Sequence, residues 1–267
     1  MFGSWTICKV MGIPIKAHFT LFLVLPLFAR HFATNANLSL AWGLLLVIAL
    51  FTSVALHELG HSWVAIKHGY HVRDIILTPI GGVALLTQSP KKASDEFKIA
   101  IAGPLVSLGL AILFIALALT LLPIIAGPEL VFSATLIGVV NLSLFLFNLL
   151  PCFPMDGGRM YRAWMMKRVG RLEATRKAVK IGTWVAGALV FIALLYSHLT
   201  LILIAIAVFL FARMELRGVE MEERRRQPPP WMHPGFPPPP FIRPSREYIL
   251  DHEEVHVSPP PYRRDQP

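Results

Sequence analysis

Long apolar runs dominate this 267-residue sequence. They cover about residues 17–32, 39–66, 99–125, 130–150 and 181–211. A run of roughly 18 or more apolar residues is long enough to cross a bilayer as a helix. Only 15% of the residues are charged, whereas a soluble domain has about 25%. These runs exclude an ordinary soluble globular protein.

The last run, 181–211, is too long for a single membrane helix. Because Ser197 and His198 interrupt it, we expect two short spans there. The sequence thus predicts an all-α polytopic membrane protein with about six transmembrane helices. Residues 70–86 read YHVRDIILTPIGGVALL. They predict a β-hairpin at the membrane surface, because Ile and Val favour strands and the Pro-Ile-Gly-Gly break favours a turn.

The basic residues indicate the orientation of the predicted spans. With six spans and the amino terminus inside, every Lys and Arg except Arg30 falls on the cytoplasmic side. Cytoplasmic loops carry an excess of these residues, so we expect both termini in the cytoplasm and a multi-pass protein of the plasma membrane. The chain does not begin like a cleaved signal peptide. Topology accounts for the net charge of +9, and we therefore expect no nucleic-acid partner.

The composition changes sharply near the end of the sequence. The 47 residues from Met221 hold 13 of the 22 prolines. We predict a membrane domain over residues 1–215 and a cytoplasmic, Pro-rich, disordered tail over residues 216–267. A solvated tail is favoured over a ligand for a proline-recognition domain.

Glu58 lies inside the second apolar run, where a charged side chain is costly and marks a functional candidate. It belongs to His57-Glu58-Leu59-Gly60-His61. Positions i and i+4 share a helix face, so both imidazoles can bind one metal ion, and the glutamate can activate water beside it. A catalytic zinc site needs a third protein ligand. A chance match is disfavoured because burying these polar residues without a role is expensive.

The third ligand is expected directly after the fourth run, in the segment NLLPCFPMDGGR at residues 148–159. Its prolines end the helix, and the glycines after Asp156 let the backbone turn closely. The second and fourth spans are expected to end on the same side, so Asp156 can meet His57 and His61 near the cytoplasmic boundary. Asp156 could instead only cap the basic helix that follows, and Cys152 is a weaker candidate ligand.

These motifs resemble the site-2 protease family of intramembrane zinc metalloproteases. The resemblance rests on HELGH at 57–61 and on NLLPCFPMDGGR, and it covers residues 1–215. Ile13–His18 resembles the family's strand before the first span, and Gly81-Gly82 resembles its glycine pair. Ala102-Gly103-Pro104 resembles the start of its third span. Ser107 is a departure, because many relatives have asparagine there, and the polar role of this position is in question.

The resemblance implies hydrolysis of peptide bonds in or near transmembrane segments, with one catalytic Zn²⁺. It implies that Glu58 is the general base, that Asn148 helps to engage the substrate, and that the zinc ligands are His57, His61 and Asp156. The implied partners are the lipid bilayer and a transmembrane substrate such as an anti-sigma factor or a membrane-held transcription regulator. No stretch between the runs is long enough for a PDZ domain, and no folded carboxyl-terminal domain is visible. We therefore expect the family's compact form.

Two other classes of protein remain as alternatives. Six spans and ten histidines permit a transporter or metal-handling protein, but transporters show repeated halves with interrupted helices, and we find no repeat. An inactive scaffold is the second alternative, and the intact His-Glu-His-Asp set argues against it. For a protease, a helical substrate must unwind to expose its carbonyls. We expect the hairpin at residues 70–86 to pair with the unwound strand.

Overall fold

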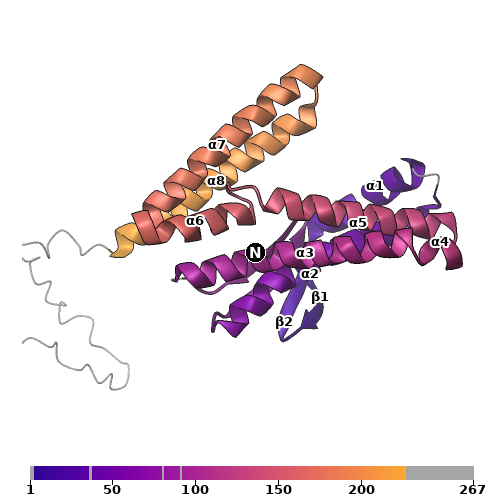
Figure 1. Cartoon of the computed structure of the whole chain (residues 1–267), viewed down its shortest axis with the longest axis horizontal. Coiled ribbons are helices and arrows are strands. Elements are labelled where there is room, and N and C mark those ends of the chain that lie inside the picture. Colours follow the sequence, from indigo (N-terminus) through magenta and orange to yellow (C-terminus); the bar gives the residue numbers. More distant parts are fainter. Residues whose placement is uncertain (1–2, 36–37, 80, 91, 227–267) are drawn as a thin grey trace, which may run out of the picture. The chain divides into compact units, whose positions relative to one another are not determined.

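The computed structural model describes residues 3–35, 38–79, 81–90 and 92–226. Within them lie four strands and eight helices (Figure 1). The strands are β1 (Ser4–Val10), β2 (Ile13–His18), β3 (Val72–Thr78) and β4 (Gly81–Leu86). The helices are α1 (Phe19–Asn35), α2 (Leu40–Lys67), α3 (Ala93–Leu119), α4 (Leu122–Ile125), α5 (Pro128–Asn148), α6 (Asp156–Val169), α7 (Arg171–Tyr196) and α8 (Leu199–Arg226).

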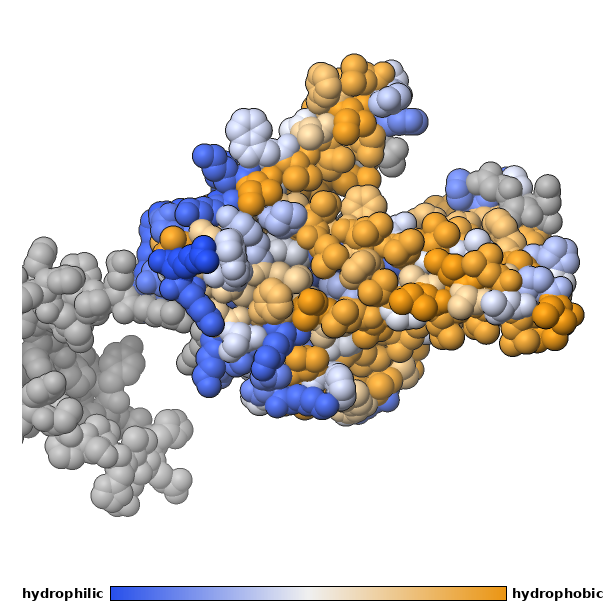
Figure 2. Space-filling view, viewed as in Figure 1, coloured by the Kyte–Doolittle hydropathy of each residue, from blue (hydrophilic) through white to orange (hydrophobic). Residues whose placement is uncertain are grey.

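Four helices, α2, α3, α5 and α7, are long and apolar enough to cross a membrane. Helix α1 is a shorter apolar helix, and α8 ends in a highly charged segment. A helix lies at each of the six predicted positions, but six membrane spans are not confirmed. The fold is mostly helical with a small sheet. Hydrophobic residues cover the helices, whereas hydrophilic residues gather where α6 lies and α7 begins (Figure 2).

The predicted break in the last apolar run is present in the structure. Helix α7 ends at Tyr196, Ser197 adopts a left-handed conformation with φ of 55°, and α8 begins at Leu199. Both helices are longer than the predicted short spans, because polar residues extend α7 at its start and α8 at its end. The chain divides into the units Met1–Arg224 and Arg225–Pro267. Of the predicted tail, residues 227–267 lie outside the described residues.

The predicted hairpin is part of a four-stranded sheet in the order β1-β2-β3-β4. Strands β3 and β4 pair antiparallel, as do β1 and β2, whereas β2 and β3 pair parallel. Helices α1 and α2 connect the two parallel strands, as such pairs require a long crossover. Sequence reasoning missed β1, because most of its side chains are exposed and no buried alternation marks it. Strand β4 is a sheet edge.

The sheet packs against the end of α2 that carries the HELGH motif. Alternate residues of β2 are buried, and Ile15 joins Ile75 of β3 and Ala65 of α2 in one apolar cluster. Lys16 Nζ donates a hydrogen bond of 2.7 Å to Asp74 and thereby lowers the pKa of that carboxyl group. The sheet is therefore fixed on α2, and β4 is held beside the motif.

Helices α1 and α2 approach closely because Gly43 has no side chain. A Cβ atom at Gly43 would collide with the backbone carbonyl of Ala29 and crowd the Ala33 methyl group. Small residues allow this kind of close backbone approach between membrane helices. The crossing therefore depends on the absence of one methyl group on α2.

We predict that Gly43→Ala destabilises the protein by about 1–3 kcal/mol, the usual cost of overpacking. Gly109→Ala is the matched control, because a Cβ atom at that exposed position of α3 meets nothing within 4 Å. The control should be neutral or stabilising by up to about 1 kcal/mol, since alanine favours helix. Thermal unfolding in detergent micelles measures both. Equal unfolding temperatures for the two variants would contradict the close crossing.

Candidate metal centre

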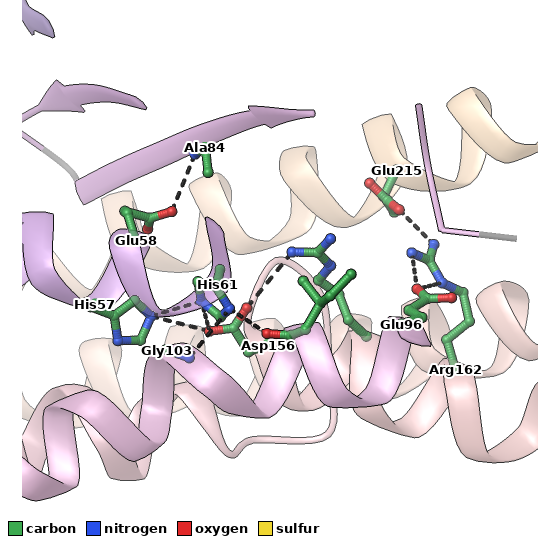
Figure 3. A network of polar contacts seen from close by, with 11 residues as sticks. His57, Glu58, His61, Ala84, Glu96, Gly103, Asp156, Arg162 and Glu215 are labelled. Carbon is green, nitrogen blue, oxygen red and sulfur yellow. Dashed lines mark hydrogen bonds and ion pairs between the residues drawn. The ribbon is translucent and has the colours of Figure 1, made fainter. Parts of the chain in front are cut away.

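His57 and His61 lie one turn apart on α2, and both side chains are buried. Their Nε2 atoms are 3.2 Å apart. Both rings face the same point beside α3 (Figure 3). The i, i+4 spacing on one helix face produces this convergence.

Asp156 completes the group from a different helix. Its Oδ2 atom lies 3.2 Å from Nε2 of His57 and 3.1 Å from Nε2 of His61. Asp156 is the first residue of α6, and the cap position belongs to Met155, which makes no side-chain cap hydrogen bond. The alternative in which Asp156 serves only as a helix cap therefore lacks support. The structure brings together the three side chains that the sequence selected.

Two glycines allow α6 to begin at this point. A Cβ atom at Gly157 would collide with the backbone of Leu149 and Leu150, and one at Gly158 would clash with the backbone of Cys152. The start of α6 can therefore fold back against the end of α5. This close approach places Asp156 beside the α2 histidines.

The outer nitrogen atom of each histidine has a partner on α3. Nδ1 of His61 lies 2.7 Å from the carbonyl oxygen of Ile99, and Nδ1 of His57 lies 2.8 Å from the hydroxyl of Ser107. A carbonyl only accepts, so Nδ1 of His61 donates and its Nε2 offers a lone pair. The Ser107 hydroxyl can accept from His57 in the same way. Ser107, the residue that departs from the asparagine of many relatives, thus orients His57.

The three inner atoms are therefore a donor set for a cation. Two imidazole lone pairs and one carboxylate oxygen face one another, and the candidate ligand atoms all lie within 4.8 Å. Acceptors that converge in a buried space repel one another unless a proton or a metal ion lies between them. Two neutral imidazoles and a carboxylate match the ligands that zinc takes at catalytic sites. The residues present therefore fit a zinc ion.

One face of α3 supports the whole group. Ile99, Gly103 and Ser107 follow one another at helical spacing. A Cβ atom at Gly103 would collide with the His61 ring, so only glycine admits that ring against α3. Sequence reasoning noted Gly103 only as part of a small-residue segment.

Glu58 lies beside the three candidate ligands and does not join them. Its Oε2 atom accepts the backbone N–H of Ala84 on β4 at 3.2 Å (Figure 3). A Cβ atom at Gly82 would collide with the Glu58 side chain. The glycine pair of the sequence thus includes a position where the sheet must approach this carboxylate closely. Glu58 is held between α2 and the sheet edge, and its carboxylate is not one of the candidate metal ligands.

Asn148 and Cys152 lie outside the group. Asn148 is the last residue of α5, and its amide donates to the Leu144 carbonyl of its own helix at 3.0 Å. Cys152 is fully buried, and burial raises the pKa of its thiol. Because the thiolate is the form that binds metal, a protonated Cys152 is a poor ligand. The group of possible metal ligands found among the described residues does not include it.

A buried ion pair fixes α6 on α3. Arg162 and Glu96 are 3% and 1% exposed, and their charged groups approach to 2.5 Å. Arg162 also pairs with Glu215 of α8 at 2.5 Å. A buried charge is tolerated when it is paired, so these contacts hold the helix that begins with Asp156. The third apolar run of the sequence begins at residue 99 and leaves Glu96 outside it, whereas the structure places Glu96 in the first turn of α3. Its position at the start of an apolar helix is the signal that could have revealed it.

A helix-borne HExxH pair, an acidic third ligand from a second helix and a glutamate that is not a ligand define a zinc metalloprotease centre. Here the centre lies among membrane-capable helices. The sequence comparisons agree with this class, because Peptidase family M50 matches residues 45–133 and 124–194. The chain belongs to this family.

Relatives of known name support the assignment. A zinc metalloprotease of Methanocaldococcus jannaschii is 42% identical over 214 residues, which are 80% of this chain and 61% of that protein. Stage IV sporulation protein FB of Bacillus subtilis is 30% identical over 52% of this chain and 49% of that protein. The chain thus spans 61% and 49% of the lengths of these two relatives.

A solved structure has the same fold. The site-2 protease from Methanocaldococcus jannaschii superposes with a TM-score of 0.60 at 39% sequence identity. The match covers 80% of this chain and 95% of that one. The resemblance inferred from the paired motifs is therefore confirmed at the level of family and fold.

We predict that Ser107→Ala weakens zinc binding by about 10- to 100-fold, as loss of a ligand's outer hydrogen bond generally does. Ser143→Ala is the matched control, because the Ser143 hydroxyl bonds only the Val139 carbonyl of its own helix in the part of the chain described. Zinc retained against a graded series of chelator concentrations measures the affinity. Ser107→Asn should preserve binding better than Ser107→Ala. Equal retention in the alanine variant and the wild type would show that Ser107 does not orient His57.

Proposed function

We propose that this protein is an intramembrane zinc metalloprotease that hydrolyses peptide bonds in or near transmembrane segments of membrane proteins. The observation that carries the proposal is the buried convergence of His57, His61 and Asp156 beside the carboxylate of Glu58, which is not one of the candidate ligands. Membership of Peptidase family M50 supports it. The arrangement favours this function over a transporter, because a metal-transport path does not need a carboxylate held apart from the metal ligands.

Each residue has a distinct role in the proposed reaction. His57, His61 and Asp156 would hold the zinc ion, which polarises the scissile carbonyl and lowers the pKa of water. Glu58 takes a proton from the attacking water and returns it to the departing nitrogen as the peptide bond breaks. Its hydrogen bond from Ala84 orients the carboxylate for both transfers.

Strand β4 is the proposed binding edge for an unwound substrate. It is the last strand of the sheet and passes beside Glu58. An extended peptide can add to such an edge through main-chain hydrogen bonds, which replace the helical bonds it loses on unwinding. Asn148, at the end of α5, helps to engage the same peptide. Its partly buried amide lies one loop before Asp156, which supports this role.

The proposed setting is a cell membrane with both termini in the cytoplasm. The hydrophilic surface around α6 and the start of α7 supports this orientation (Figure 2), because basic residues mark the cytoplasmic side. The proposed substrate is a regulated membrane protein such as an anti-sigma factor or a membrane-held transcription regulator. The resemblance to site-2 proteases supports this substrate class.

We predict that Glu58→Gln keeps zinc but slows cleavage of a transmembrane substrate by at least about 100-fold, the minimum usual loss for a general base. Glu129→Gln, an exposed change of the same kind on α5, is the control and should retain activity. Metal content and single-turnover cleavage of a reconstituted substrate measure the two effects. Full activity of the Glu58 variant would exclude the proposed mechanism.

We predict that Ala84→Pro raises KM for a transmembrane substrate about tenfold or more, because proline distorts the edge strand to which the peptide would add. It should also lower kcat, because it removes the N–H that Glu58 accepts. Ile7→Pro is the control on the opposite edge strand, at a position where the β1 register shifts. Zinc content should be unchanged in both variants. If Ala84→Pro lowers only kcat, its effect is limited to Glu58, and the role of β4 in substrate binding is rejected.

A further inference from the structure

The free edge of β4 presents backbone groups at alternate residues. In an antiparallel pair, one residue bonds the partner strand and the next faces away from it. The amide of Thr87, directly after β4, donates at 3.0 Å to the carbonyl of His71, which directly precedes β3. Alternation along the strand therefore turns the N–H and C=O groups of Leu86, Ala84 and Gly82 towards the free edge.

One of these edge donors is already in use. The N–H of Ala84 bonds Oε2 of Glu58 at 3.2 Å (Figure 3), which agrees with its direction away from β3. Glu58 passes close to Gly82 on its way to the edge, since a Cβ atom at Gly82 would collide with the Glu58 side chain. The sheet edge beside the metal centre therefore lacks one free donor, at Ala84.

A peptide added to β4 meets a different partner at this point than at the neighbouring positions. At Leu86 and Gly82, a peptide carbonyl can accept an edge N–H, as in other cases of strand addition. At the N–H of Ala84, the peptide carbonyl instead meets the Glu58 carboxylate. An ionised carboxylate and a carbonyl are both acceptors, so they cannot bond each other. This one peptide carbonyl is left without a donor from the sheet.

A water molecule can fill this gap, because it can donate to the carboxylate and keep a lone pair free. Its oxygen then lies beside the unpaired carbonyl and can attack the carbonyl carbon. Attack forms the carbon–oxygen bond while Glu58 takes the water proton. Cleavage of the carbon–nitrogen bond then returns that proton to the departing nitrogen. The unpaired carbonyl is therefore the one that a base at Glu58 can serve.

We propose that the hydrogen bond between Ala84 and Glu58 sets the register of cleavage, so that the scissile carbonyl is the one facing the N–H of Ala84. The inference rests on the proposed protease function and on β4 as the binding edge. The residue that carries this carbonyl is called the scissile residue below. The N–H and C=O of a strand residue point to the same side. The N–H groups of the scissile residue and of the residues two positions away therefore face β4, for either strand direction, and those one position away face outward.

The first test is an N-methyl scan of one cleavable transmembrane substrate, with the full-length zinc enzyme in phosphatidylcholine nanodiscs. An N-methyl group removes the donor and pushes the peptide away from the edge. At the scissile residue, or two positions before or after it, the methyl group should lower kcat/KM about tenfold or more. One or three positions before it, the methyl group points away from β4 and should change kcat/KM less than about twofold, because no sheet bond is lost. The departing nitrogen is left unmodified.

Two inactive variants then test the role of the Ala84 amide. Glu58→Gln keeps an acceptor for this amide, because the side-chain oxygen of glutamine accepts hydrogen bonds, whereas Glu58→Ala leaves the amide free for the peptide. Uncleaved substrate should bind Glu58→Ala about fivefold more tightly than Glu58→Gln, the size expected from one hydrogen bond. A substrate whose scissile carbonyl is reduced to a methylene should bind the two variants equally. Zinc content confirms that both variants are folded.

The outcomes separate the register from the function on which it rests. If the methyl group is harmful one position before the scissile residue and harmless at that residue, or equally harmful at every position, the register is overturned and Glu58-dependent proteolysis stands. Equal binding of the unmodified substrate to the two folded variants also overturns it. The methyl scan uses the wild-type chain, so it decides the register even where Glu58→Ala does not fold. If no substrate is cleaved in a Glu58-dependent way, the protease function and the register both fail.

Discussion

The structure depends on one electrostatic constraint, which is the convergence of three electron-pair donors in a buried space. Nε2 of His57, Nε2 of His61 and Oδ2 of Asp156 lie about 3 Å apart. Such atoms repel one another unless a cation joins them. The surrounding chain is built to hold this arrangement: α3 fixes the outer nitrogen of each ring through Ile99 and Ser107. The centre is therefore a property of three helices and not of the HELGH motif alone.

The sequence predicted the parts of this centre that local spacing determines. The i, i+4 histidines must share a helix face, and the prolines before Asp156 must end α5 near that face. Ser107 and Gly103 act across a helix contact, so their roles depend on how α3 packs on α2, which spacing does not specify. The polar role of Ser107 was questioned because it departs from asparagine, yet a hydroxyl can accept the same hydrogen bond.

The charged contacts of α6 were missed for a related reason. Glu96 lies just before the third apolar run of the sequence, whereas the structure buries it in the first turn of α3 against Arg162. A charge inside an apolar run identified Glu58, but this signal does not extend to a residue at the border of such a run. Glu96 nevertheless has a structural role, because its buried ion pair with Arg162 joins α6 to α3. Asn148 stays a prediction, since its amide bonds its own helix in this state.

In the proposed mechanism, the contact between Glu58 and β4 links substrate binding to proton transfer. Gly82 and Ala84 bring the sheet edge against the carboxylate, so β4 cannot move without changing the surroundings of the proposed base. The sheet is in turn anchored to α2 through Ile15, Ile75 and Ala65. In the proposed reaction, β4 binds the extended peptide and also orients Glu58, so the scissile bond and the proton acceptor are held at a fixed relative position. Proximity of this kind replaces a chance encounter by a fixed geometry, which explains why a small sheet accompanies a metal centre among apolar helices.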